Sequence, residues 1–152
     1  MTDVRKLNAI RDAGVDQALD DFGPVDVTLA LAEICSKNTH AADRTPQGVS
    51  RADWKRAAKL LDGLSRRFPQ EMIAESRGAV GHARALVSRT VERYGLLDVV
   101  EACADSSEEE AFELDADARD EADSPLHDEA DDWGRCAKLF QWAADKLGQI
   151  GF

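Results

Sequence analysis

The feature that most restricts the fold of this chain is an apolar repeat near its C-terminus. Ser124 is a typical helix N-cap residue, and Pro125 suits the first helical position, where an amide hydrogen is not needed. The apolar residues that follow are spaced alternately by four and three positions: Leu126, Ala130, Trp133, Ala137, Phe140, Ala144 and Leu147. A period of about 3.5 residues is typical of a long helix that packs against other helices along its whole length. The chain should therefore supply several more helices to cover this one.

The earlier part of the chain predicts further helices. Apolar residues spaced by three and four positions predict four of them, over about 3–21, 25–37, 51–68 and 78–94. Gly14 lies on the apolar face of the first helix, and Gly23-Pro24 should separate it from the second, because proline cannot continue a helix. Ser50 should cap the third helix, and Gly95 should end the fourth.

Weaker helical signals and the composition complete an all-α pattern. A short helix is expected near 70–75, a helix-compatible piece follows at 96–104, and 38–49 has the composition of a loop. Alanine is abundant, aromatic residues make up only 6% of the chain, and we find no segment that predicts a strand. We therefore predict a compact all-α bundle of five to seven helices, in which residues 1–152 form a single domain.

The sequence lacks the patterns of membrane-spanning segments, secretory signals and paired cysteines, and this sets our expectations for cellular location and cysteine chemistry. No apolar run approaches the roughly 20 residues that span a membrane, and the polar stretch from Met1 to Ala9 lacks the apolar centre of a secretory signal. We therefore expect a cytoplasmic protein. The cysteines Cys35, Cys103 and Cys136 are far apart and form no Cys-x-x-Cys pair, so we expect buried free thiols instead of a disulfide or a zinc site.

The three tryptophans differ in their positions on the predicted helices. Trp54 and Trp133 fall on apolar stripes and should anchor the core. Trp142 falls beside the apolar seam of the last helix. We expect it to pack on a second neighbouring element; the alternative is exposure for contact with a partner.

The negative charge of the chain is concentrated in residues 105–132, which we call the acidic segment. It carries fourteen Asp or Glu against a single base, Arg119, whereas residues 1–104 carry fifteen acids and fifteen bases. The net charge of −11 therefore arises in the last third of the chain. Such a surface repels nucleic acid and anionic membranes, and it attracts proteins whose binding surface is basic.

Two structures are consistent with residues 105–123. Low hydrophobicity with high net charge is typical of a disordered, solubilising linker. The alternative, which we favour, is a helix capped by Ser107, because Ser107 and Glu110 have the spacing of a capping box. Such a helix would dock on the core through a thin apolar stripe, formed by Ala111, Leu114, Ala118 and Ala122.

As a helix, this stretch would approach nucleic acid in charge density. Nine carboxylates lie between Glu108 and Asp123, which at the helical rise of 1.5 Å gives one charge per ~2.7 Å, against one per ~1.7 Å of axis in duplex DNA. Four acids would be successive i,i+4 neighbours with no lysine between them: Glu109, Glu113, Asp117 and Glu121. The predicted partner-binding surface comprises Glu108, Glu109, Glu113, Asp117, Asp120, Glu121, Asp128, Asp131 and Asp132.

Residues 44–104 have a modest basic excess, with eleven bases against seven acids. We interpret them mainly as a solvated helix face. Pairing with the acidic segment and a phosphate-binding patch are the alternatives, and the second fits poorly with a chain that is acidic as a whole.

One pair of motifs resembles a magnesium site. Glu110-x-x-Glu113 followed by Glu129-x-x-Asp132 resembles the paired carboxylates of all-α nucleotide pyrophosphohydrolases of the MazG type. The resemblance implies Mg²⁺ held between two facing helices. A segment so rich in acids also produces this spacing by chance.

A second short motif, His127-Asp128, resembles the HD dipeptide of helical metal-dependent phosphohydrolases. That resemblance implies further ligands, for which His82 and Asp145 are the only candidates, and Asp145 falls on the same predicted helix as His127. Because both resemblances cover only a few residues, we predict no catalytic residue, metal or cofactor.

We predict a non-catalytic interaction protein. Its acidic surface would bind a basic, normally nucleic-acid-binding protein and block or regulate it, in the manner of a nucleic-acid mimic. The main alternative is a regulatory or structural subunit that binds its partner through apolar helix faces. A second alternative is a helical Mg²⁺-dependent nucleotide hydrolase. None of these involves direct contact with nucleic acid or a membrane.

Overall fold

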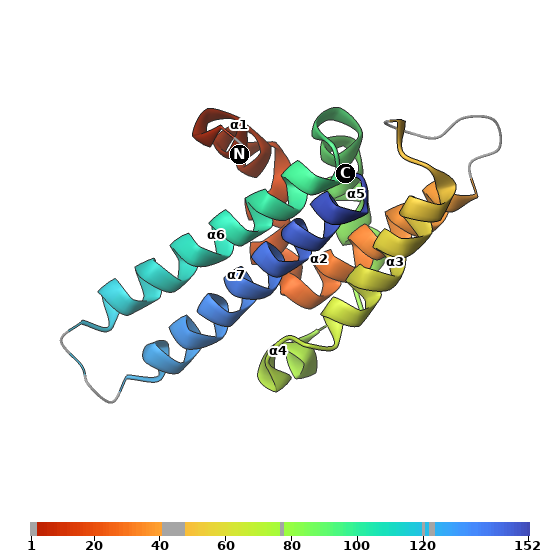
Figure 1. Cartoon of the computed structure of the whole chain (residues 1–152). Helices are drawn as coiled ribbons and strands as arrows, with labels where there is room; N and C mark the ends of the chain where they lie inside the picture. Colours follow the sequence, from red (N-terminus) through yellow and green to blue (C-terminus); the bar gives the residue numbers. More distant parts are fainter. Residues whose placement is uncertain (1–2, 41–47, 77, 120, 122–123) are drawn as a thin grey trace.

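The computed structural model describes residues 3–40, 48–76, 78–119, 121 and 124–152, and it is helical almost throughout (Figure 1). The elements in chain order are α1 (Val4–Ile10), the π-helical η1 (Arg11–Val15), α2 (Asp16–Thr39), α3 (Arg51–Ser65), α4 (Gln70–Glu75), α5 (Val80–Tyr94), α6 (Leu96–Asp117) and α7 (Pro125–Ile150). The predicted all-α bundle with a long C-terminal helix is confirmed, and no strand occurs among the described residues. Most of the expected loop at 38–49 lies outside them.

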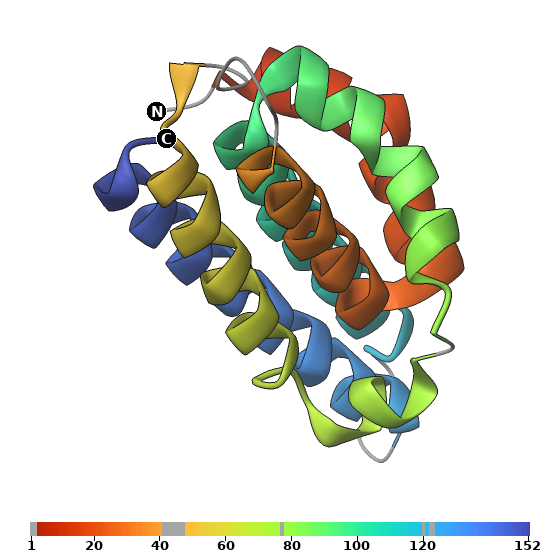
Figure 2. The same cartoon turned by 90° about the vertical axis from the view of Figure 1, so that its right-hand side faces the viewer.

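The helices pack around two central pairs. α6 and α7 form an antiparallel hairpin, and their contact is the most extensive in the molecule (Figure 1). α2 packs against α3 on one side and α5 on the other, as the second view shows (Figure 2). The two central pairs are thus α6 with α7 and α2 with α3. Since α3 also contacts α7, it joins the two pairs. Among the described residues, no helix is long and apolar enough to cross a membrane.

Aromatic residues fill the core between the helices. Trp54 is fully buried, and its ring forms a T-shaped pair with the Phe152 ring, with 4.9 Å between centroids. Phe140 is also fully buried and packs against Phe68 at 5.4 Å. Trp133 is half-buried beside the core, so both tryptophans expected there contribute to it.

The start signals for two helices are confirmed by hydrogen bonds. The Ser50 hydroxyl accepts from the Asp53 amide at 3.1 Å, and the Ser124 hydroxyl accepts from the Leu126 amide at 3.3 Å. Gly95 ends α5 with a φ of 93°, as its position in the sequence indicates. Local capping therefore decides where these helices begin and end.

The Gly23-Pro24 pair produces a sharp change of direction. Gly23 has φ 81° and ψ 168°, so α2 consists of two helical parts joined at a kink. Pro24 lies just after the kink, and its carbonyl accepts a 2.7 Å hydrogen bond from the Thr28 hydroxyl. The predicted boundary is thus present as a kink inside α2.

The single helix predicted over 3–21 is wrong. The chain turns at Gly14, whose φ of 152° is not helical, and α1, η1 and the start of α2 replace one straight element. A Cβ atom on Gly14 would lie 3.1 Å from the Leu86 carbonyl oxygen of α5. Gly14 is buried, as its place on the apolar face suggested, but it serves a turn and a close backbone approach instead of helix continuity.

Gly14→Ala should lower the free energy of unfolding by about 2 kcal/mol, because alanine is strained at this φ and crowds the Leu86 carbonyl. Urea denaturation would measure the change. The matched control is Gly63→Ala in α3, where an added Cβ meets nothing within 4 Å. That substitution should stabilise the protein by roughly 0.5 to 1 kcal/mol. Equal effects of the two substitutions would contradict the role assigned to Gly14.

Candidate functional site

The acidic segment is an ordered helix as far as Asp117, but it does not begin where the sequence indicated. α6 runs without interruption from Leu96 to Asp117. Ser107 is fully buried inside it, and its hydroxyl donates to the Cys103 carbonyl oxygen at 2.8 Å. The predicted capping box at Ser107 is therefore wrong, because the apolar piece at 96–104 is already helical and passes directly into the acidic part.

The predicted row of i,i+4 acids is only partly formed. Glu109, Glu113 and Asp117 lie on α6, but Glu121 follows the end of the helix and cannot continue the row. Asp120 lies outside the described residues. Glu113, Asp117 and Glu121 are exposed. The described acids of this segment thus lie on α6, at Glu121 after its end and on α7.

Glu109 is engaged inside the protein by Arg11 of η1. The Arg11 guanidinium, only 13% exposed, contacts Glu109, donates to Asp105 at 3.0 Å and binds both Asp16 oxygens at 2.9 and 3.2 Å. The Ser106 hydroxyl donates to Asp16 at 2.6 Å. Partial burial would lower the pKa of Arg11, but its hydrogen bonds to Asp16, Glu109 and Asp105 raise that pKa above its ordinary value. The base that binds these acids of α6 is therefore Arg11, which lies outside the basic stretch 44–104.

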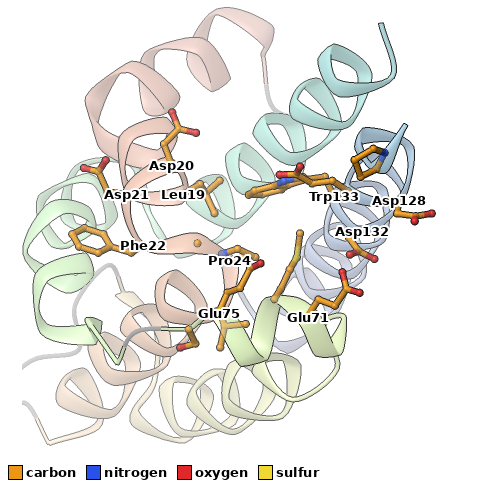
Figure 3. Close-up of a pocket in the computed structure, with 16 residues that line it drawn as sticks. Leu19, Asp20, Asp21, Phe22, Pro24, Glu71, Glu75, Asp128, Asp132 and Trp133 are labelled. Carbon is orange, nitrogen blue, oxygen red and sulfur yellow. The ribbon is translucent and has the colours of Figure 1, made fainter. Parts of the chain in front are cut away.

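An acidic cavity lies between α2, α4 and α7 (Figure 3). Its volume is about 760 Å³. Seven carboxylates from the three helices line it: Asp20, Asp21, Glu71, Glu75, Asp128, Glu129 and Asp132. None of the described lining residues is a lysine or arginine. The apolar part of the wall comes from residues that include Phe22, Met72 and Trp133.

The kink of α2 and the short helix α4 create this cavity. After the kink, Asp26 is fully buried, and its carboxylate accepts from the Ser76 hydroxyl at 2.5 Å and from the Ala79 amide at 3.3 Å. These bonds fix the chain just after α4. The Cys136 thiol contacts the Met72 sulfur at 3.2 Å, which places α4 beside α7.

Partial burial, together with repulsion between neighbouring acids, raises the pKa of two carboxyl groups on this side of the molecule. For Glu110 the causes are partial burial and then the charges of Asp20, Glu113, Glu129 and Asp117. The pKa of Asp20 is raised by partial burial and by its neighbours Asp16 and Asp21. A positively charged ligand would relieve this repulsion.

Glu110→Gln should increase stability at pH 7 by a few tenths of a kcal/mol, because it removes a charge that is partly buried and that its neighbours repel. A raised carboxyl pKa means that the folded state binds the proton more tightly than the unfolded state. The cost of ionised Glu110 is therefore lost as pH falls below its ordinary range near 4.3, and the variant and wild type should converge there. Thermal melts at pH 7 and pH 3.5, with Glu108→Gln as control, would measure this. Destabilisation at pH 7 would contradict it.

The acids predicted to bind a partner are distributed over different surfaces. Asp128 and Asp132 line the cavity, whereas Glu108 lines a groove elsewhere between α6 and α7. Asp131 is exposed on α7.

Four cavity acids were missed by the sequence argument: Asp20, Asp21, Glu71 and Glu75. They belong to residues 1–104, whose acids and bases balance, so the charge composition gave no reason to single them out. The available signals were local: an acidic pair just before Gly23-Pro24 and an i,i+4 acidic pair on a short helix.

The carboxylates of the magnesium motif lie on two helices that pack against each other. Glu110 and Glu113 are on α6, and Glu129 and Asp132 are on α7. The charge of Glu129 is one of the causes, after partial burial, that raise the pKa of Glu110. No group of three or more His, Cys, Asp or Glu among the described residues could hold a metal ion. The geometry therefore adds no support for the hydrolase alternative.

The residues of the HD-like motif have separate partners. His127 bonds to Asp115 at 3.2 Å and to the Glu121 carbonyl oxygen at 2.9 Å, which ties the end of α6 to the start of α7. His82 stacks on Phe22 with 6.3 Å between ring centroids. Asp145 accepts from the Gln141 amide at 3.3 Å. The structure does not bring these groups together.

The cysteines and the third tryptophan have structural surroundings. All three cysteines are buried free thiols, as predicted, and burial raises the pKa of each to about 12. Trp142 is half-buried against the core, and the Arg67 guanidinium lies 4.5 Å from its ring centroid. The expected packing of Trp142 is confirmed.

In comparisons with known proteins, no family model, curated protein or solved structure significantly matches this chain.

Proposed function

We propose that this protein is a non-catalytic binding module whose acidic surface binds a basic, nucleic-acid-binding protein and blocks or regulates it. The observation that carries the proposal is the acidic cavity, in which carboxylates from three helices converge without a lysine or arginine among the described lining residues. Acids far apart in the sequence are thereby held together on folded elements instead of being dispersed in solvent.

The chemistry of the cavity favours cationic side chains. A partner's lysine or arginine that enters it would meet several carboxylates, and the half-buried Trp133 offers an aromatic wall against which a guanidinium can stack. Asp20 and Glu110 already have raised pKa values because of burial and nearby negative charges, so a cation would lower the energy of the ionised surface.

The density of charge favours a nucleic-acid-binding partner among basic proteins. Besides partial burial, the charges of Glu113 and Asp117 on α6 and of the cavity residue Glu129 raise the pKa of Glu110, so these acids lie near one another. Asp128 and Asp132 on α7 line the cavity itself. A groove that normally holds phosphates would meet a comparable spacing of negative charges here. Binding of this kind excludes nucleic acid from the same groove.

The test is affinity capture from a native lysate, followed by competition. Wild type should retain basic proteins at about 50 mM salt and release them at about 500 mM, because screening shortens the range of charge attraction. A retained DNA-binding protein should lose its DNA when wild type is added in a gel-shift assay. Asp128→Asn/Glu129→Gln/Asp132→Asn should bind that protein about tenfold more weakly.

The control removes equal charge from other exposed acids: Asp12→Asn/Glu92→Gln/Asp145→Asn. This variant should compete as wild type does. Equal weakening by both triple variants would show that net charge, and not the cavity, determines binding. Retention of partners that is insensitive to salt would favour the apolar-subunit alternative instead.

A further inference from the structure

A second groove lies between α1, α6 and α7. Its volume is about 700 Å³. On α7, the groove residue Gly134 follows the cavity residue Asp132 by two positions, which is about half a helical turn. The groove and the acidic cavity therefore lie on opposite sides of α7.

The floor of this groove is built from small and aliphatic side chains. It includes Leu7, Ala104, Ala111, Gly134 and Ala137. A Cβ atom added to Gly134 would meet nothing within 4 Å, so the floor is open at this point. Small residues allow the backbone of another helix to approach closely, and a groove between two helices is a common receptor for the apolar stripe of a third.

The two rims of the groove carry opposite charges. Glu101, Asp105 and Glu108 lie on the α6 rim, and Lys138 lies on the α7 rim. Glu108 and Lys138 line the same groove without forming an ion pair with each other, and neither has an ion pair elsewhere in the described part of the chain. Asp105 is already bound by Arg11, but Glu101 and Glu108 still outnumber Lys138 on the two rims. This charge favours an occupant that is mainly basic and places its bases along α6.

An exposed aromatic residue extends the contact surface. Phe112 is 74% exposed and follows Glu108 by one turn of α6, so the two project from the same side of that helix. Only Val4 is a comparably exposed large apolar residue in the described ranges. Phe112 is therefore available to an occupant of the groove.

We propose that this groove binds an amphipathic helix from a partner protein, with its apolar stripe on the small-residue floor and lysine or arginine along the α6 rim. A second copy of this chain is disfavoured as occupant, because it would bring a net charge of −11 to an acidic rim. The proposal does not depend on the acidic cavity, which faces the other side of α7.

The test uses a synthetic peptide of about 15 residues with leucines at helical spacing and lysines along one flank. Fluorescence anisotropy would measure its binding to the full chain, and a scrambled peptide of equal composition is the reference. Wild type should bind the patterned peptide more tightly than the scrambled one. Gly134→Gln should weaken binding about tenfold, because its side chain occupies the floor.

The matched control is Gly148→Gln on the same helix, where an added Cβ also meets nothing within 4 Å. Both substitutions favour helix formation, so loss of folding is not a competing explanation. The control and the triple cavity variant should both bind the peptide as wild type does. Phe112→Ala should weaken binding without changing the melting temperature, since this side chain is exposed.

Three results would overturn the proposal. The first is failure of wild type to distinguish the patterned from the scrambled peptide, or to bind either. The second is unchanged binding by Gly134→Gln. The third is a set of peptide-induced amide shifts centred on Asp20 and Glu75, which would place the peptide in the acidic cavity instead of the groove.

Discussion

Trp54→Ala should lower the free energy of unfolding by about 4 kcal/mol, the largest effect that we expect from one substitution in this protein. Trp54 is fully buried in α3, and its ring contacts Phe152 at the end of the chain. Its removal leaves a cavity where α3 meets α7, because helices on both sides are held by their own contacts. Urea denaturation followed by far-ultraviolet circular dichroism would measure the loss.

Trp142→Ala is the matched control for that substitution. Trp142 is half-buried, and Arg67 and Lys146 lie over its ring at 4.5 and 6.0 Å from the centroid. Its loss should cost about 1 kcal/mol, mainly in packing and cation–π contact. Equal losses for the two tryptophans would contradict the packing described for Trp54.

Arg11→Met should lower the free energy of unfolding by about 3 kcal/mol at neutral pH. Methionine keeps much of the side-chain volume, but Asp16, Asp105 and Glu109 lose their shared cation and are left close together. The loss should be smaller in high salt, which screens the repulsion among the three carboxylates. Chemical denaturation at about 50 mM and 1 M sodium chloride would measure both effects.

The pH dependence of the Arg11 variant has a definite sign. Partial burial opposes ionisation of Asp16, but hydrogen bonds from Arg11 and Ser106 lower its pKa below the ordinary value. The stability that this pair contributes is present above the unfolded-state pKa, near 3.9, and is lost as pH falls through the lower folded-state pKa. The difference between variant and wild type should therefore shrink in acid.

The control for Arg11 is Arg66→Met, which breaks an exposed i,i+4 pair with Asp62. It should change stability by less than about 0.5 kcal/mol, because exposed ion pairs contribute little. A loss comparable to that of Arg11→Met would show that general surface charge, and not the three-acid network, determines the result.

Helix positions were predictable where local chemistry decides them. Ser50, Gly95 and Ser124 mark helix ends by capping and backbone conformation, and the C-terminal helix follows its apolar period. Gly14 was not predictable as a turn, because its φ and the nearby Leu86 carbonyl depend on where α5 lies. Ser107 has a capping spacing in the sequence, but the preceding apolar residues keep the chain helical through it.

The candidate site was only partly predictable for a related reason. Asp128 and Asp132 could be named from the concentration of acids in one segment. Asp20 and Glu75 join them through the α2 kink and the placement of α4, which are tertiary features. Glu109 could be named as an acidic residue of the segment from composition, but its ion pair could not be predicted, because its partner Arg11 lies far from it in the sequence.

The weakest wall of the acidic cavity is α4. This six-residue helix contains no buried residue. Its described contacts include the hydrogen bond that the Cys136 thiol donates to the Met72 sulfur, and just beyond its end the Ser76 hydroxyl donates to Asp26. Segments with so little buried surface open at a small fraction of the global unfolding free energy. Amide hydrogens of Met72 and Ile73 should consequently exchange with solvent far faster than those of α7. The mouth of the cavity can therefore widen to admit a long side chain while the helical hairpin behind it stays rigid.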